Sequence, residues 1–260
     1  MFFVACPAST AKRAGAAGYP GAMCGRYAAS AAQDELVEIF QIDEVAGPLP
    51  PARFNIAPTD PVPAVLERVP QQDPDAPAVR RLVPLRWGLV PSWSKDLSGG
   101  ARMINARAET VAEKPAFRKA LASRRCLLPA DGYYEWYTSE ATDARGKPLK
   151  QPFFIRPADG GLLVMAGLYE FWRDPGGEWV VSTTIITTRA SDVLGHIHDR
   201  MPMVIDPSSW DAWLDPKMGV EAVDLLRVHA ADLEAYAVST LVNRVANDGP
   251  ELIVPLAESR

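Results

Sequence analysis

The chain has 260 residues, and its 48% hydrophobic and 23% charged residues are the proportions of an ordinary globular protein. Its formal net charge of −5 excludes a protein whose whole surface is basic and holds nucleic acid by charge alone. No apolar run reaches the ~18 residues that a membrane span needs, so we expect no membrane partner. The 24 prolines favour short strands and turns over long helices.

The cysteines and histidines restrict the setting. Cys6, Cys24 and Cys126 cannot all pair and are too few for a disulfide scaffold, which favours a reducing cytoplasm. The three histidines form no zinc motif with them. We therefore expect no metal and no cofactor.

Residues 1–22 differ from the rest of the chain. They are rich in Ala, Gly and Pro, and they lack the roughly 7–15-residue apolar core of a secretory signal. We interpret them as an extension that either precedes the true start at Met23 or is removed. Either event, followed by loss of Met23, would make Cys24 the N-terminal residue. With no internal repeat or long linker beyond them, we expect residues 23–260 to form one domain.

The first half of the chain predicts few regular elements. Residues 30–42 have the apolar spacing of a helix, with Ser30 as its N-cap. Residues 50–69 predict a turn followed by a strand. Residues 80–93 predict a strand interrupted by prolines, which we expect to be an edge strand or an irregular one. Residues 109–124 predict a segment that is partly helical.

The second half is richer in strands. Four β-rich runs are separated by Gly, Pro and Asp, as in antiparallel hairpins, and they cover residues 126–137, 151–157, 162–172 and 178–188. Short helices and a late strand follow, at residues 191–199, 208–215, 219–229 and 235–240. The predicted fold class is therefore α+β, a single compact domain of mainly antiparallel strands with short flanking helices.

Positive charge is concentrated in residues 80–126. This segment has eleven Lys or Arg against three Asp or Glu, a net charge of +8, so the remainder of the chain carries −13. One interpretation is a cationic surface for phosphates. The other is a solvated helix whose charges are used in ion pairs.

Cys24 lies in the sequence Met-Cys-Gly-Arg-Tyr. Inside a longer chain it would be an ordinary buried cysteine. As an N-terminal residue it would carry a thiol and an α-amine on adjacent carbons, both partly unprotonated near neutral pH. Such an aminothiol attacks an aldehyde through its amine, and the thiol then closes a thiazolidine. The small Gly25 would let a substrate approach the backbone closely.

Three further motifs carry polar side chains suited to chemistry. Asn105 and Arg107 have the spacing of a strand, so both can face one ligand such as a phosphate, or they form a polar pair in a loop. Glu135 lies among aromatic residues, where desolvation suits a carboxyl group to proton transfer, although an exposed strand position is the alternative. His198 suits acid–base chemistry, but it can also be structural, with Asp199 or Arg200 anchoring its loop.

An ordered set of motifs runs from Met23 to about residue 215: MCGRY, RFNIAPT, RWGLVPSW, MINARAET, RCLLPADGYYEW, LYEFW, TTIITT and IHDRMP. Together they resemble the SOS response-associated peptidase family, whose members are described as abasic-site processing proteins. The resemblance implies a compact α+β domain and covalent capture of abasic sites in single-stranded DNA.

The resemblance also assigns residues. It implies that Cys24 is the nucleophile, that Glu135 and His198 are catalytic, and that Asn105 and Arg107 hold the sugar and phosphate. It further implies that Arg26 and Thr187 contact phosphate or sugar. It also implies that Trp87 and Trp93 stack on bases. The implied partner is single-stranded DNA, so we expect a cytoplasmic protein that associates with the nucleoid when bound to DNA. Because the sequence has no exposed heptad or repeat, we expect a monomer.

Two other functions remain open. In a cysteine peptidase, His198 would activate the thiolate of Cys24 and the segment before Cys24 would be cleaved. A noncatalytic reader of single-stranded DNA would use the basic segment and form no covalent adduct. A Schiff base at the sugar would also permit weak strand-cleaving lyase activity.

Overall fold

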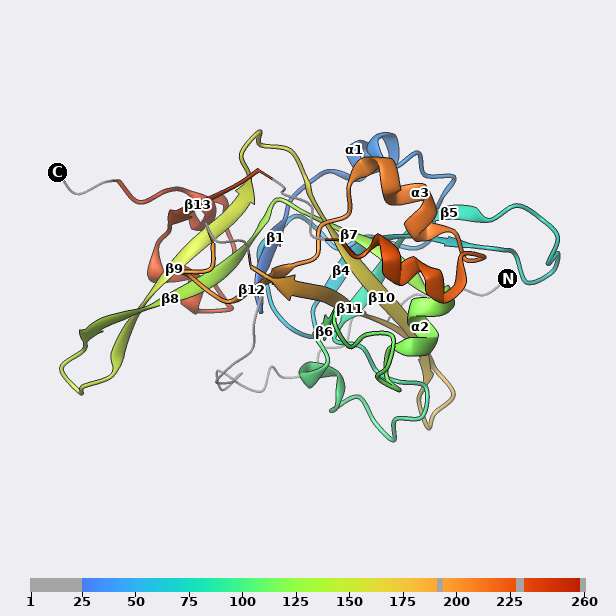
Figure 1. The fold of residues 1–260 in the computed structure, drawn as a ribbon, viewed down its shortest axis with the longest axis horizontal. Helices are drawn as coiled ribbons and strands as arrows, with labels where there is room; N and C mark the ends of the chain where they lie inside the picture. Colours follow the sequence, from blue (N-terminus) through green and yellow to red (C-terminus); the bar gives the residue numbers. More distant parts are fainter. Residues whose placement is uncertain (1–24, 191–193, 228–231, 258–260) are drawn as a thin grey trace.

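The computed structural model describes residues 25–190, 194–227 and 232–257, which form two β-sheets on a shared core. In Figure 1 the smaller sheet lies on the left and the larger one in the centre and right. No helix of the described residues is long and apolar enough to cross a membrane.

The larger sheet closes on itself. Its strands run in the order β12 (Arg200–Pro202), β11 (Trp179–Arg189), β10 (Leu163–Arg173), β7 (Arg125–Ala130), β4 (Pro61–Arg68), β5 (Val79–Trp87) and β2 (Glu44–Val45), with β6 (Asn105–Arg107) beside β11. A parallel pairing of β11 with β5 joins Ser182 to Arg86 and Thr183 to Trp87. This pairing completes a small barrel of β11, β10, β7, β4 and β5.

The smaller sheet has five strands. Their order is β13 (Leu233–Ala237), β9 (Pro148–Pro157), β8 (Gly132–Thr142), β1 (Tyr27–Ala29) and β3 (Arg53–Ile56). The chain crosses from the barrel to this sheet at Asp131, between β7 and β8. One face of the sheet supplies Tyr27, Tyr133 and Ile155 to the same core as the barrel interior.

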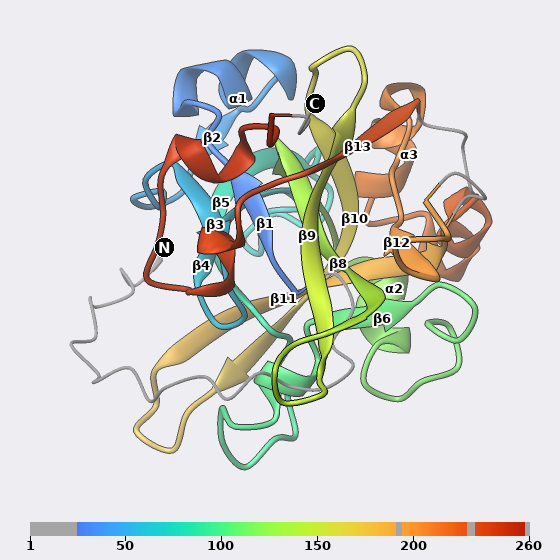
Figure 2. The same ribbon diagram turned by 90° about the vertical axis from the view of Figure 1, so that its left-hand side faces the viewer.

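Two further apolar clusters cover the outer surfaces. On the barrel side, a cluster gathers around the helices α1 (Gln33–Ile39), α2 (Arg118–Ser123) and α3 (Trp210–Leu214), where Phe40 packs on Trp210 with ring centroids 4.7 Å apart. On the outer face of the smaller sheet, Tyr134 and Phe154 pack against Val242 and Leu252. In Figure 2 the C-terminal segment, in red, lies in front of this sheet.

Short 3-10 turns complete the fold. They are η1 (Gly100–Arg102), η2 (Pro207–Ser209), η3 (Gly219–Leu225), η4 (Thr240–Asn243) and η5 (Pro250–Ile253). The prediction of mainly antiparallel strands with short flanking helices is confirmed, and strands predominate.

Three local predictions are wrong. The first helix starts at Gln33 after Ala32, so Ser30 is not its N-cap. The run 126–137 is two strands, β7 and β8, because the chain changes sheets at Asp131. For residues 80–93 the edge-strand alternative is wrong, since β5 pairs with β4 throughout and on its other side with β2 up to Leu82 and with β11 from Arg86, which makes it an irregular strand.

The prolines of β5 and the remaining helix predictions have simple explanations. Pro84 lies between the stretches of β5 that pair with β2 and with β11, and it faces Pro63 of β4, so its missing N–H breaks no ladder there. In the segment 109–124 only α2 is helical. Of the helix expected at 191–199, residues 191–193 lie outside the described part and residues 194–197 form turns.

Candidate functional site

The strand that follows Cys24 runs alongside the strand that carries Glu135. Cys24 itself lies outside the described residues. Tyr27 pairs with Tyr133, and the Tyr134 N–H donates to the Arg26 carbonyl oxygen at 3.0 Å. Gly25 and Glu135 are the next residues beyond this bond in the two segments.

Glu135 is buried, with 3% of its surface exposed. It faces Phe153 across the β8–β9 ladder. The predicted burial among aromatic residues is confirmed, and the alternative of an exposed strand position is wrong. A carboxyl group in this position is sheltered from bulk water at the edge of the shared core.

Asn105 and Arg107 begin and end β6. The strand is parallel to β11, with Asn105 paired to Ile185. Ala106 between them is buried and Arg107 is exposed, so Asn105 and Arg107 share the other face, as the spacing predicted.

Trp87 connects β1 to β6. Its indole N–H donates to the Ile104 carbonyl oxygen at 3.0 Å, and the Tyr27 ring meets it edge-on at 5.1 Å between centroids. Trp87 is completely buried, so the prediction that it stacks on a base is wrong. Instead it fixes the start of β6 against the start of β1.

Trp93 has the opposite environment. It is 57% exposed, on a loop whose base is closed by a bond from the Leu89 N–H to the Met103 carbonyl oxygen at 3.1 Å. The Trp172 indole N–H donates to the carbonyl oxygen of the next residue, Ser94, at 2.7 Å. Trp93 is therefore available to a base, on a loop that leads directly into β6.

Arg200 clamps the His198 loop to β6 and β11. Its guanidinium donates to both carboxylate oxygens of Glu109, at 2.5 and 2.9 Å, and to the Thr187 carbonyl oxygen at 2.7 Å. The Arg200 contact lowers the pKa of Glu109. Arg200 is 7% exposed, so this ion pair is the anchor that one interpretation of the sequence assigned to Asp199 or Arg200.

Thr187 supports this clamp and does not reach the surface. It is completely buried, and its hydroxyl donates to the Ala106 carbonyl oxygen at 3.4 Å. The predicted contact of its side chain with DNA is therefore wrong.

His198 accepts a hydrogen bond on one ring nitrogen. The Arg200 N–H donates to Nδ1 at 3.1 Å, which requires a lone pair there and leaves the proton of the neutral ring on Nε2. The Asp199 carboxylate also lies 3.1 Å from Nδ1. In the neutral ring, Nε2 is a hydrogen-bond donor.

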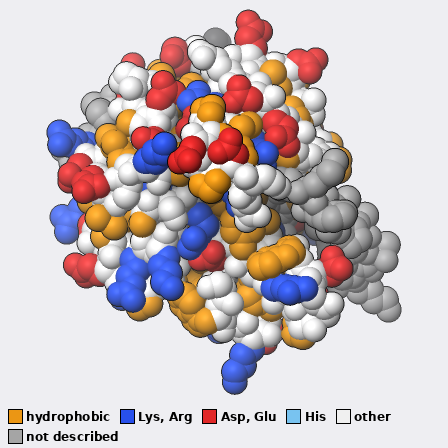
Figure 3. Space-filling model, turned by 90° about the vertical axis from the view of Figure 1, so that its right-hand side faces the viewer, with side chains coloured by type: hydrophobic (Ala, Val, Ile, Leu, Met, Phe, Trp, Pro, Cys, Tyr) orange, Lys and Arg blue, Asp and Glu red, His pale blue; other side chains and the backbone are white. Residues whose placement is uncertain are grey.

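The basic segment divides between structural and exposed residues. Arg80, Arg81 and Arg124 form ion pairs, and Arg125 is buried against backbone carbonyls. The exposed members are Lys95, Arg102, Arg107, Lys114, Arg118 and Lys119. On the face in Figure 3, acidic side chains gather towards the top and basic ones towards the bottom, the side of the segment between β5 and α2 in Figure 1. Part of the segment is thus used in ion pairs, and a phosphate surface made by its exposed residues stays a prediction.

Arg26 is half-buried and bonded within the protein. Its Nη1 donates to the Asn55 side-chain oxygen at 2.8 Å and to the Val242 carbonyl oxygen at 3.0 Å. Burial lowers the pKa of this guanidinium. Asn55 lies in the RFNIAPT motif, but its role was missed because the groups that it binds are about 190 residues away in the chain.

The free thiol of the described residues is not a nucleophile. Cys126 is completely buried, and burial raises its pKa to about 12. No three His, Cys, Asp or Glu side chains of the described part gather as ligands of a metal ion.

Comparisons with known proteins show named relatives of this chain. The chain is 40% identical over 236 residues to the abasic site processing protein YoqW of Bacillus subtilis, covering 89% of this chain and 99% of that protein. It is 33% identical over 233 residues to the mouse abasic site processing protein HMCES, covering 78% of this chain and 64% of that protein.

Solved structures share the fold. A protein from Bacteroides thetaiotaomicron superposes with a TM-score of 0.73 at 23% identity, covering 90% of this chain and all of that one. A phage-related protein from Bordetella bronchiseptica gives 0.62 at 30% identity, covering 83% and 94%. Residues 23–245 match the family described as SOS response associated peptidase (SRAP). The chain therefore belongs to the SRAP family.

Proposed function

We propose that this protein processes abasic sites in single-stranded DNA by bonding to them covalently through Cys24, in a form whose chain begins at that residue. The observation that carries the proposal is the pairing of β1 with β8 and the Arg26–Tyr134 bond beyond it, which lies one residue from Gly25 in one segment and one residue from the buried Glu135 in the other. The names of the relatives supply the substrate class, because both YoqW and HMCES are abasic site processing proteins.

The chemistry is a condensation. An abasic sugar in its ring-opened form has an aldehyde at C1′. The α-amine of Cys24 adds to this carbon, and the carbonyl oxygen leaves as water to give a Schiff base. The thiol then adds to the same carbon while its proton moves to the nitrogen, which closes a thiazolidine. The reference pKa values of the amine and thiol leave both groups partly reactive near neutral pH.

The surrounding side chains have distinct roles in this reaction. Glu135 moves protons to the sugar oxygen and from the amine, as a general acid and base. His198 donates a hydrogen bond from Nε2 to the departing oxygen, consistent with the bond that its Nδ1 accepts. Asn105 and Arg107 hold the sugar and its phosphate from the common face of β6, so that the aldehyde stays within reach of the amine.

An exposed aromatic ring supports a single-stranded DNA partner. Trp93 offers a ring face to an unpaired base, and stacking of this kind is indifferent to sequence. The exposed basic residues between β5 and α2 attract the phosphates.

The test uses protein expressed from Met23, with loss of that methionine confirmed by mass. It is mixed with an oligonucleotide that contains one abasic site and is separated on a denaturing gel. We expect a heat-stable shifted band that is absent in Cys24→Ala, while Cys24→Ala still binds the same DNA under native conditions. A band that persists in Cys24→Ala would refute the role of Cys24, and no band from protein with a free N-terminal cysteine would refute covalent capture.

A peptidase activity, which the family description names, is the second candidate. It needs a base to deprotonate the thiol, and the bond accepted by Nδ1 of His198 leaves Nε2 as a donor in the neutral ring. Intact mass of the full 260-residue chain tests this candidate. A chain that shortens to begin at Cys24 on standing, but not in His198→Ala, would favour the peptidase.

A further inference from the structure

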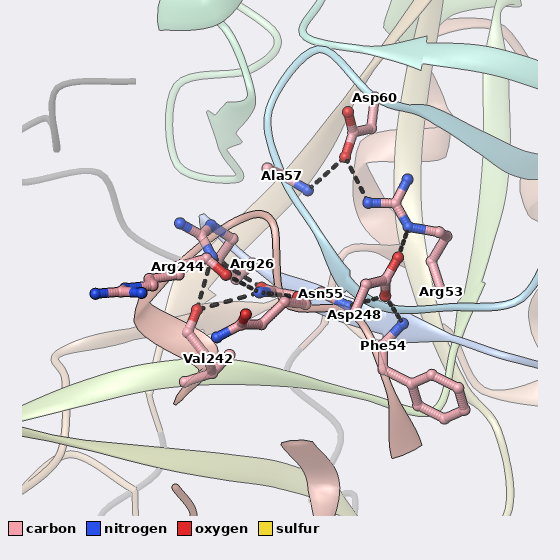
Figure 4. Close-up of polar contacts among 10 residues, drawn as sticks. Arg26, Arg53, Phe54, Asn55, Ala57, Asp60, Val242, Arg244 and Asp248 are labelled. Atoms are coloured by element: carbon pink, nitrogen blue, oxygen red, sulfur yellow. Dashed lines mark hydrogen bonds and ion pairs between the residues drawn. The ribbon is translucent and has the colours of Figure 1, made fainter. Parts of the chain in front are cut away.

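Asn55 of β3 uses both ends of its side chain, and it is completely buried. Its oxygen accepts the bond from Arg26, and its nitrogen lies 3.2, 3.0 and 2.9 Å from the carbonyl oxygens of Val242, Arg244 and Asn247 (Figure 4). The amide has two protons for these three acceptors, so it has no capacity left for any other partner. One side chain thus joins β1, β3 and the C-terminal segment.

Arg26 is held from two directions. Its carbonyl oxygen accepts the Tyr134 N–H from β8, and its guanidinium binds Asn55 and the Val242 carbonyl oxygen on the outer face of the sheet. Only Gly25 separates Arg26 from Cys24, and glycine restricts the backbone least of all residues. Arg26 is therefore the last fixed side chain before the proposed nucleophile.

Asp248 makes a second tie that does not involve Arg26. One carboxylate oxygen accepts from the backbone N–H groups of Phe54 and Asn55, at 2.7 and 3.1 Å, and the other pairs with the Arg53 guanidinium (Figure 4). Arg53 also bonds to Asp60, which caps the Ala57 N–H at 3.1 Å. Asp248 thus fastens the same C-terminal segment to the same strand.

We propose that Asn55 is a positioning residue for Cys24, acting through Arg26. This inference rests on the proposed covalent capture. Arg26 uses Nη1 to bind Asn55 and the Val242 carbonyl oxygen, so one task of Arg26 is to fix the start of β1 and thereby the direction from which the amine meets the aldehyde. A reacting group displaced by about 1 Å can slow a reaction by about 100-fold. The contact of Asn55 with Arg26 therefore controls the rate of capture more than the affinity for DNA.

The test measures the rate of capture against the concentration of abasic DNA, which separates the saturating rate from the half-saturating concentration. In Asn55→Ala we expect the saturating rate to fall by about 10- to 100-fold and the half-saturating concentration to stay within about twofold. Asp248→Asn is the matched control, because it weakens the tie to Arg53 and leaves Arg26 in place. It should destabilise the fold in thermal melts and keep the saturating rate of the parent.

The following results would overturn the proposal or the proposed function. A saturating rate in Asn55→Ala within about twofold of the parent, or an equal loss in Asp248→Asn, would overturn the proposal. If Asn55→Ala does not fold, Arg26→Met replaces it, since it keeps the stem and loses the fork. A change in Arg26→Met confined to the half-saturating concentration would also overturn the proposal and make Arg26 a phosphate contact. Absence of capture by the parent protein itself would instead refute the proposed function.

Discussion

The two sides of the site are held by different means. On the barrel side, Asn105 and His198 are placed by β6 and β12, which both pair with β11, and by the Arg200–Glu109 clamp. On the sheet side, Glu135 and the start of β1 belong to the five-stranded sheet, where Asn55 and Arg26 bind groups that are 187 to 216 residues away in the chain. The barrel side is organised by neighbouring strands, and the sheet side depends on the end of the chain.

This difference separates reaction from binding. The side chains of the barrel side that reach solvent, Trp93 and Arg107, are suited to holding DNA. On the sheet side, the buried Glu135 and the bond between Arg26 and Asn55 are suited to setting the rate of the covalent step. Changes on the sheet side should therefore act on the saturating rate of capture, and changes in exposed residues of the barrel side on affinity.

The largest effect is expected at Glu135. Glu135→Gln keeps the shape of the side chain and removes its acid–base function, so capture at saturating DNA should slow by about 100- to 10,000-fold. The control is Glu170→Gln on β10, which alters a carboxylate of similar burial, 5% exposed and paired with Arg124 at 2.8 Å. If Glu135→Gln captured abasic DNA at the parent rate, Glu135 would not be the general acid and base of the reaction.

The next effect concerns the clamp of the barrel side. In Arg200→Lys the charge remains, but an ammonium cannot reproduce the fork to Glu109 and Thr187, and we expect a loss of about 1–3 kcal/mol in the free energy of unfolding. Because Arg200 lowers the pKa of Glu109 from its ordinary 4.5, the pair stabilises the fold above that pH. Its contribution disappears as the pH falls through the lowered pKa of Glu109.

Urea unfolding between pH 3 and 7 measures this loss, and a constant difference between Arg200→Lys and the parent across that range would contradict the ion pair as its cause. Glu109→Gln provides the matched comparison, since it leaves Arg200 in place and removes only the titrating partner. Glu109→Gln should approach the stability of the parent at the acid end, whereas Arg200→Lys should keep the part of its loss that comes from the bond to the Thr187 carbonyl oxygen.

A smaller effect distinguishes the two most exposed tryptophans of the described residues. Trp93 and Trp179 are 57% and 58% exposed, but only Trp93 lies on the loop that leads into β6. Trp93→Ala should weaken binding of single-stranded DNA by about 1–3 kcal/mol, with no change in the saturating rate. Fluorescence anisotropy in the Cys24→Ala background measures binding alone. An equal loss of DNA binding in Trp179→Ala would mean that any exposed tryptophan contributes to binding, whatever its position.

The sequence was informative where a local pattern determines a local structure. Alternation predicted the common face of Asn105 and Arg107, and the aromatic neighbours of Glu135 indicated its burial. The barrel closure was not predictable, because the β5–β11 pairing joins Arg86 to Ser182 with no signal in either segment. Trp87 and Thr187 were assigned to DNA for the same reason, since their motifs do not reveal that other elements cover them.

The contacts of Asn55 could not be predicted from the sequence either. The RFNIAPT motif was visible, but nothing in it indicates that an asparagine binds carbonyl oxygens of residues 242–247. Those acceptors are backbone groups, which any sequence supplies. The side chains of the C-terminal segment therefore do not indicate that this contact exists.

The smallest effect is expected where the chain passes from one side to the other. Asp131 joins β7 to β8, and its N–H donates to the Ala28 carbonyl oxygen at 2.8 Å. Burial raises the pKa of its carboxyl group above the ordinary 3.8, partly offset by hydrogen bonds to Ser30. The folded state then holds the proton more tightly than the unfolded state, so this group weakens stability as the pH rises from 3.8 through the raised pKa.

Asp131→Asn removes that titration, so the variant should gain stability relative to the parent over this range and keep a constant advantage at neutral pH. Urea unfolding from pH 3 to 8 measures the difference. Salt then separates two causes, because Glu35 also raises the pKa of Asp131 through its charge. Screening by salt weakens the contribution of Glu35 and leaves that of burial. An advantage that survives high salt shows that the crossing between the two sides places a carboxyl group where its environment, and not a neighbouring charge, disfavours ionisation.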